Sequence, residues 1–117
     1  MTTVNIAIED LENDIKLVKF EGQLDESNVD EKSKLIYSLI ESTDKPQMIF
    51  DLSGLEYMNS KSIGYLNDWY LKVSDKGGKI VLAAAKENIM DILDVVGMTQ
   101  ILEQFPTLEQ AKKAFNE

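Results

Sequence analysis

Runs of apolar residues with the length and pattern of strands alternate along this chain with segments in which apolar residues recur every three or four positions. Five segments have the strand pattern: residues 4–8, 15–20, 47–52, 79–84 and 101–105. Helical spacing follows each of the last four, so the predicted order is β-β-α-β-α-β-α-β-α. Strands that alternate with helices pair in parallel through right-handed crossovers. The sequence therefore predicts an α/β fold with a mixed, largely parallel sheet.

Local signals predict the ends of several elements. Ser53-Gly54 indicates a turn after the third strand, and Asn28 with Glu31 has the spacing of a capping box before the first helix. The helix after the third strand is expected to span residues 62–76 and to end in a left-handed cap at Gly77-Gly78. In the next helix, the spacing turns four side chains inward: Ile89, Ile92, Leu93 and Val96. Thr107 and Gln110 have capping-box spacing before the last helix.

The composition excludes several classes of partner. Of 117 residues, 21 are acidic and 12 basic, which gives a net charge of −9, and every basic residue is lysine. Phosphate backbones and anionic membranes need clustered positive charge, so we expect neither nucleic acid nor membrane as a partner. The apolar runs are too short to span a bilayer and no signal peptide is visible, so a cytoplasmic protein is expected. The length fits a single domain over residues 1–117, and we expect a monomer.

The sequence lacks the common catalytic patterns. It has no histidine and no cysteine, which removes the usual hydrolase triads, thiol nucleophiles and zinc sites. Ser60 and Lys61 do not form a dyad, because neighbouring helical residues point about 100° apart. Gly77-Gly78-Lys79 lacks the earlier glycine and the following Ser or Thr of a phosphate-binding loop. We therefore expect no enzymatic activity, no catalytic residue, no metal and no cofactor.

The segment between the third strand and the helix after it carries the most information about function. Asn59 and Ser60 precede an amphipathic helix that begins near Ile63, so a serine hydroxyl is expected on a surface loop at a helix N-terminus. The unpaired N–H groups and the dipole of a first helical turn favour negative charge, so a phosphate on Ser60 would be tolerated. From spacing alone, an N-cap is the commoner role of such a serine. A phosphorylation switch is the alternative.

Several pieces of sequence form a longer pattern around Ser60: Asp51-Leu-Ser, Tyr57-Met-Asn-Ser60 and Ile63-Gly64. Three more pieces lie before and after them: Glu21-Gly-Gln-Leu-Asp25, Val95-Val-Gly-Met98 and Leu108-Glu-Gln-Ala111. In this order and spacing they resemble the STAS domain family, specifically the bacterial anti-sigma factor antagonists. The resemblance covers most of the chain. It implies the STAS fold, which has the order of strands and helices predicted above.

The resemblance also implies a site. In this family the first serine after the acidic residue of the central motif is phosphorylated, which corresponds to Ser60 here. The chain departs from the usual motif at three positions, where Asn59 replaces Asp, Lys61 replaces a small residue and Ser62 replaces Gly. Ser62 is therefore a rival phosphorylation site. Six residues are expected to contact the partner: Asp25, Asn59, Lys61, Ser62, Tyr65 and Trp69. For Tyr65 and Trp69 the alternative is partial burial in the core, and for Asp25 it is a role at the helix start.

The function implied by the resemblance is partner switching. The unphosphorylated protein would bind a GHKL-type serine kinase that also acts as the anti-sigma factor, and sigma factor would be released. The kinase would phosphorylate Ser60 with Mg-ATP and so end the binding, and a metal-dependent serine phosphatase would reverse it. Two alternatives stay open: a stand-alone STAS subunit that regulates a transporter ATPase, as in lipid-transport importers, and a STAS domain that senses a small ligand.

Overall fold

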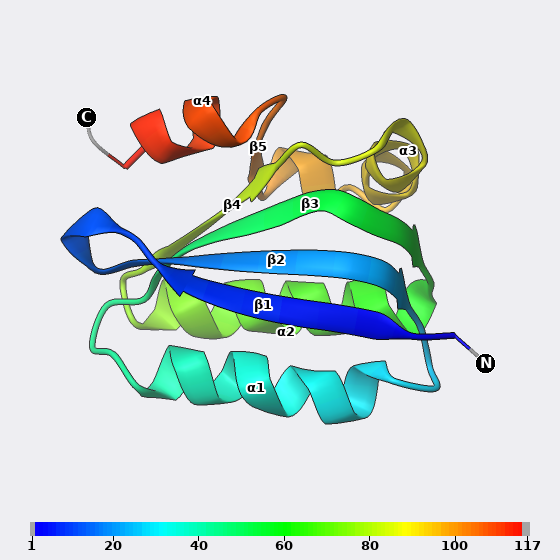
Figure 1. The fold of residues 1–117 in the computed structure, drawn as a ribbon, viewed down its shortest axis with the longest axis horizontal. Coiled ribbons are helices and arrows are strands. Elements are labelled where there is room, and N and C mark those ends of the chain that lie inside the picture. Colours follow the sequence, from blue (N-terminus) through cyan, green and yellow to red (C-terminus); the bar gives the residue numbers. More distant parts are fainter. Residues whose placement is uncertain (1, 116–117) are drawn as a thin grey trace.

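A five-stranded sheet organises the computed structural model, which describes residues 2–115 (Figure 1). The strands, in the order in which they lie side by side, are β1 (Val4–Asp10), β2 (Ile15–Leu24), β3 (Gln47–Met58), β4 (Lys79–Ala83) and β5 (Glu103–Phe105). Only β1 and β2 are antiparallel, and each later neighbour pairs in parallel. The prediction of a mixed, largely parallel sheet is confirmed.

The helices follow the strands in the predicted order. They are α1 (Val29–Glu41), α2 (Ser60–Asp75), α3 (Glu87–Val95) and α4 (Leu108–Lys113), with short 3-10 turns η1 (Glu12–Asp14) and η2 (Met98–Gln100). In Figure 1, α1 and α2 run side by side below the sheet, while α4 lies above it. None of the helices within residues 2–115 combines the length and apolar character needed to cross a membrane.

The core forms on both faces of the sheet. On the side of α1 and α2, the rings of Phe20 and Phe50 lie 5.2 Å apart, and the ring of Trp69 from α2 lies 5.9 Å from Phe50. On the other side, Ile49 of β3 belongs to a smaller cluster that includes Ala111 of α4. Because successive strand residues point to opposite faces, a strand covered on both sides has a continuous apolar run, as residues 48–50 do.

The predicted turn at Ser53-Gly54 is wrong, because β3 continues without interruption to Met58. The pairing of β2 with β3 shifts register between Lys19 and Glu21. At that shift, a Cβ on Gly54 would lie 2.7 Å from Cγ of Glu21. Gly54 has no side chain, so it permits close approach of the neighbouring strand β2. This is a common reason for a glycine inside a strand.

The helix ends agree with the predictions in part. Gly77 has a φ of 75°, and the N–H of Gly78 donates to the carbonyl of Val73 at 2.9 Å, which confirms the left-handed end of α2. The hydroxyl of Thr107 accepts from the N–H of Gln110, which confirms Thr107 as the N-cap of α4 and one half of the predicted capping box. The capping box predicted at Asn28 is wrong. The side chain of Asn28 instead forms hydrogen bonds with the residues before it: it accepts from the N–H of Asp25 and donates to the carbonyl of Gln23.

Candidate functional site

Reciprocal hydrogen bonds between Asn59 and Ser62 define the start of α2. The side-chain oxygen of Asn59 accepts from the N–H of Ser62 at 3.0 Å, and the hydroxyl oxygen of Ser62 accepts from the N–H of Asn59 at 2.8 Å. This is a capping box with Asn59 as the N-cap. Ser60 is therefore the first residue of the helix, and its interpretation as an N-cap is wrong.

The Ser60 side chain is exposed, and its hydroxyl has no hydrogen-bond partner among residues 2–115. The N–H groups of Ser60 and Lys61 belong to the first turn, where no preceding carbonyl of the helix accepts them. The capping box leaves these two N–H groups free, since it uses those of Asn59 and Ser62. The hydroxyl thus lies at the positive end of the helix dipole of α2.

Ser62, in contrast to the exposed Ser60, is buried, with 0% of its surface exposed. Its hydroxyl accepts from the N–H of Asn59 and donates to the carbonyl of the same residue at 2.9 Å. Phosphorylation of Ser62 would require the first turn of α2 to open, so the geometry favours Ser60 as the acceptor. The expectation that Ser62 contacts a partner directly is wrong for this conformation, because its side chain is covered.

Lys61 is held by a carboxylate from α1. Its ammonium lies 2.8 Å from one carboxylate oxygen of Asp30, and the hydroxyl of Tyr65 donates to the other at 2.5 Å. The hydrogen bond with Lys61 is the main reason that the pKa of the Asp30 carboxyl is lowered, and the same bond raises the pKa of Lys61. Both groups are exposed and charged at neutral pH, so the ammonium of Lys61 is directed toward α1 and is paired there with Asp30.

Asp25 is buried beside this site, and its contacts stay within the β2–α1 loop and the N-terminus. One carboxylate oxygen accepts from the hydroxyl of Ser27 at 2.6 Å, and the other accepts from the hydroxyl of Thr2 at 2.5 Å. These hydrogen bonds, that of Ser27 first, lower the pKa of Asp25. Glu26 makes the contact with the Ser60 segment, because its carboxylate accepts from the side-chain amide of Asn59.

The sequence analysis did not identify Glu26 and Asp30 as site residues, because each forms its hydrogen bond with a residue more than 30 positions away in the chain. No local pattern marks either residue. Their carboxylates do not build a metal site. Among residues 2–115, no group of three or more acidic side chains is arranged to hold a metal ion.

Trp69 lies in the core with 1% of its surface exposed, so its expected role as an exposed partner contact is wrong. It shares one face of α2 with Leu66 and Val73, and this face turns toward the sheet. The alternative of burial therefore holds. Tyr65 lies one helical turn earlier and is half-buried, with its ring 6.1 Å from that of Trp69.

An apolar groove of about 510 Å³ adjoins Ser60, and we call it the Ser60 groove. The end of β3 and the first turns of α2 form one side, and α3 forms the other. Val95 and Val96 are 86% and 53% exposed along it, and Tyr57 is 45% exposed. The prediction that Val96 points inward is wrong. The helix α3 ends at Val95, and the chain then turns through Gly97, which has a φ of 83°. Asp91 adds a carboxylate to the lining.

Comparisons with known proteins give one matching family model and several solved structures of the same fold. A family model described as STAS domain matches residues 6–111. An anti-sigma factor antagonist from Mycobacterium paratuberculosis is 21% identical, with a TM-score of 0.87 over 98% of this chain and 96% of that chain. The phosphorylated form of the Bacillus cell fate determinant SpoIIAA is 16% identical, with a TM-score of 0.73 over 95% and 99%. The murine anion transporter Slc26a9 is 14% identical, with a TM-score of 0.75 over 95% of this chain and 22% of that chain. At these identities, likeness to solved structures shows the fold alone.

The two serines at the start of α2 are expected to differ in their effect on stability. Ser62→Ala removes half of the capping box and leaves the N–H of Asn59 without its acceptor, so it should lower the free energy of unfolding by about 1 kcal/mol. Ser60→Ala removes an exposed hydroxyl and should change it by less than about 0.5 kcal/mol. Urea denaturation of both variants measures the difference. Equal losses would contradict the assigned N-cap.

Asp25 is expected to make stability depend on pH. Its pKa is lower in the folded than in the unfolded chain, so its contribution is complete above the unfolded value of about 4 and is lost as the pH falls through the folded value. Asp25→Asn should therefore be less stable than the wild type at pH 7, and the gap should narrow in acid. Urea denaturation across pH measures this, with Asp44→Asn, the loss of an exposed carboxylate, as the matched control. A gap that stays constant with pH would contradict it.

Proposed function

This chain belongs to the STAS domain family, and we propose that within it the protein acts as an anti-sigma factor antagonist in a partner-switching module. Its unphosphorylated form binds a GHKL-type serine kinase that doubles as the anti-sigma factor, and sigma factor is released. Phosphorylation of Ser60 ends that binding. The observation that carries the proposal is an exposed, unbonded serine hydroxyl at the first turn of α2, beside an apolar groove.

The start of α2 is suited to hold a phosphate on Ser60. A phosphoserine carries a charge of about −1.5 to −2 at neutral pH. The free N–H groups of the first turn and the positive end of the helix dipole favour that charge. The phosphorylated protein therefore needs no change of fold.

The same charge would weaken docking over the Ser60 groove. Ser60 lines the groove together with Ile63 and Val95, so a partner that covers these apolar side chains also covers the phosphate. Docking would strip water from the phosphate, and where the partner brings no positive group to replace that water, the cost is about 2–5 kcal/mol. At about 1.4 kcal/mol per tenfold change, the affinity would fall by roughly one to three and a half orders of magnitude. Glu26 and Asp91 bring further negative charge to the same region.

In this cycle the protein is a substrate and a binding protein, and it supplies no catalytic group. The kinase transfers the terminal phosphoryl group of Mg-ATP to the hydroxyl oxygen of Ser60, and ADP and the hydroxyl proton leave. A metal-dependent phosphatase hydrolyses the ester with water, which returns the hydroxyl and releases inorganic phosphate. The exposed, unbonded hydroxyl of Ser60 supports its role as the acceptor in this cycle.

A stand-alone STAS subunit that binds a transporter ATPase is the second proposal. It draws support from the anion transporter Slc26a9, in which a segment with this fold makes up 22% of the chain. In that role Ser60 would be structural or regulatory. Binding to a transporter ATPase would then be insensitive to phosphorylation, which separates this proposal from the first.

Phosphorylation of Ser60 is the first prediction of the proposed cycle. Incubation with Mg-ATP and a serine kinase encoded beside this protein should add one phosphate, mapped to Ser60 by peptide mass spectrometry. Ser60→Ala should take up none and keep its affinity for the kinase, while Ser53→Ala, the loss of another exposed serine, should behave as wild type. Phosphate on Ser62 would correct the site, and no phosphate with an active kinase would reject the switch.

Docking of the kinase over the Ser60 groove is the second prediction of the proposed cycle. Val95→Glu places a charge on the most exposed apolar side chain of the groove and should weaken binding of the unphosphorylated protein to the kinase at least about tenfold. Leu35→Glu, at an exposed leucine of α1, is the matched control and should bind normally. Calorimetric titration measures both. Normal binding by the Val95 variant would exclude this groove as the docking surface.

A further inference from the structure

The outer edge of β1 is a free edge of the sheet (Figure 1). The sheet has two such edges, because β1 pairs only with β2 and β5 pairs only with β4. An edge strand presents a row of unpaired backbone N–H and C=O groups, to which another chain can add a strand. Soluble proteins usually protect their edges against such pairing, so the protection of each edge indicates whether it is used.

The two edges differ in their protection. Short strands, prolines, lysines and β-bulges all prevent pairing at an edge. The strand β5 has only three residues, and Pro106, which has no N–H, follows it directly. In contrast, β1 has seven residues, contains neither proline nor lysine, and pairs with β2 without a shift in register from Val4 to Asp10. One edge is therefore protected and the other is open.

Hydrogen bonds with β2 show which backbone groups of β1 face outward. The N–H of Gln23 donates to the carbonyl of Thr3, and the N–H of Leu11 donates to the carbonyl of Ile15, each at 2.8 Å. Hydrogen-bonded positions alternate along an antiparallel pair, so the odd-numbered residues of β1 bond to β2. The outward-facing N–H and C=O groups, which pair with no other strand among residues 2–115, are those of even-numbered residues: Val4, Ile6 and Ile8.

The side chains in the middle of β1 are uncharged on both faces of the sheet. Ile6 and Ile8 pack against the margin of the core and are only half-buried. A strand added to the edge would cover more of their apolar surface, which stabilises the pairing. Asn5 and Ala7 point to the opposite face and are exposed. Neither face therefore repels a strand that approaches this edge.

The charged residues of β1 come at its end and are paired within the chain. The carboxylate of Glu9 lies 3.8 Å from the ammonium of Lys19, and the carboxylate of Asp10 pairs with Lys16. Both lysines belong to the neighbouring strand β2. Although the whole chain carries a net charge of −9, the edge that a second copy would approach is thus locally balanced.

We propose that two copies of this chain form a dimer by antiparallel pairing of their β1 strands, with the two-fold axis at Ile6. The residue on the axis faces outward, so Ile6 exchanges both of its hydrogen bonds with Ile6 of the second copy. Directly opposite side chains interact, and like charges there are destabilising. No pair in this register opposes two like charges: Val4 lies opposite Ile8 of the second copy, Asn5 opposite Ala7, and Thr3 opposite Glu9.

Neighbouring registers are less complementary. With the axis at Ala7, Val4 would lie opposite Asp10 of the second copy, and with the axis at Ile8, Ile6 would lie opposite it. Each of these registers places an apolar side chain against a carboxylate. The axis at Ile6 avoids this and is therefore the register that we assign.

The dimer replaces the monomer that the length alone predicts, and it does not depend on the phosphorylation cycle. The Ser60 groove is formed by the end of β3, by α2 and by α3, and β2 separates these elements from β1. Pairing at β1 therefore leaves the groove uncovered in both copies.

Sedimentation equilibrium of the full chain, from about 10 μM to about 1 mM, tests the dimer. The mass should rise from the 13.2 kDa of one chain toward twice that value. Pairing of single strands gives a small interface, so we expect a dissociation constant of about 100 μM. The mass of one chain at all concentrations would overturn the proposal.

Backbone amide shifts, measured by NMR on dilution from about 1 mM to about 50 μM, locate the interface. We expect the changes to concentrate at residues 3–9. Changes concentrated instead at Val95 and Val96 would show that the copies associate through the Ser60 groove, and this would overturn the pairing at β1.

Charge variants at two exposed positions of β1 test the register. Asn5→Lys combined with Ala7→Lys places like charges opposite each other twice and should weaken the dimer about tenfold. Asn5→Lys combined with Ala7→Glu places opposite charges there and should dimerise at least as well as the wild type. Equal dimerisation by these two double variants would overturn the assigned register.

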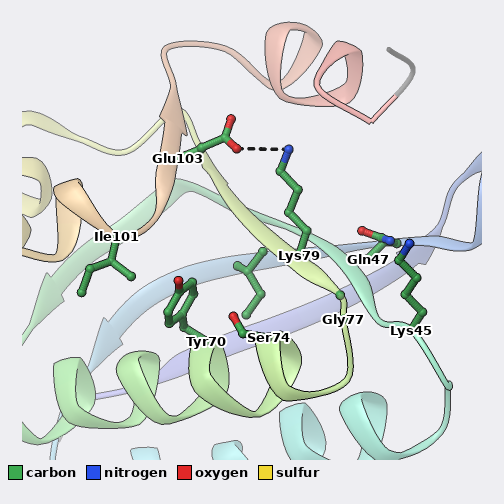
Figure 2. A pocket seen from close by; sticks show the side chains of 10 residues that line it. Lys45, Gln47, Tyr70, Ser74, Gly77, Lys79, Ile101 and Glu103 are labelled. Carbon is green, nitrogen blue, oxygen red and sulfur yellow. Dashed lines mark ion pairs between the residues drawn. The ribbon is translucent and has the colours of Figure 1, made fainter.

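The matched control adds two positive charges away from β1. Ser74→Lys combined with Gln100→Lys does this at two exposed positions. Ser74 lines an open cavity of about 490 Å³ at the C-terminal end of α2 (Figure 2). This control should dimerise as the wild type does. A loss equal to that of the two lysines on β1 would show that the overall charge, and not this edge, governs the association.

Discussion

The hydrogen bonds between Asn59 and Ser62 determine which residue begins α2, and the candidate site depends on that choice. With Asn59 as the N-cap, Ser62 turns inward and is buried, while Ser60 turns outward with its hydroxyl unbonded. A helix that began two residues later, as the periodicity alone predicts, would have left Ser60 in a loop and exposed Ser62. The capping box thus separates an acceptor serine from a structural one, although they are only two residues apart.

The sheet then brings other segments to this point. In a parallel sheet the connections after the carboxyl ends of the strands gather along one edge, which is where α/β proteins usually place their sites. Here the loop after β2 contributes Glu26, which binds Asn59, and the segment after β4 leads into α3, whose Asn88 side chain donates to the carbonyl of Glu56 at 2.9 Å. The Ser60 groove is the space that these connections leave open.

The two cavities at the ends of α2 differ in chemistry. The Ser60 groove exposes valine and tyrosine side chains next to carboxylates, which suits a macromolecular surface with basic groups around an apolar centre. The cavity at the other end has a more polar lining, which includes the ion pair between Lys79 and Glu103 (Figure 2). One amphipathic helix forms a wall of both, while its buried face, with Leu66, Trp69 and Val73, anchors it to the sheet.

The sequence by itself determined the order of strands and helices, the parallel character of the sheet and the serine at the start of α2, because each depends on local periodicity or on a contiguous motif. It did not determine that Gly54 lies inside a strand, that Trp69 is buried, or that Glu26 and Asp30 approach the site. Those facts depend on a register shift between strands, on which helix face meets the sheet, and on contacts between residues more than 30 positions apart. Only the tertiary structure brings such groups together, because no local pattern records what a side chain will meet across the fold.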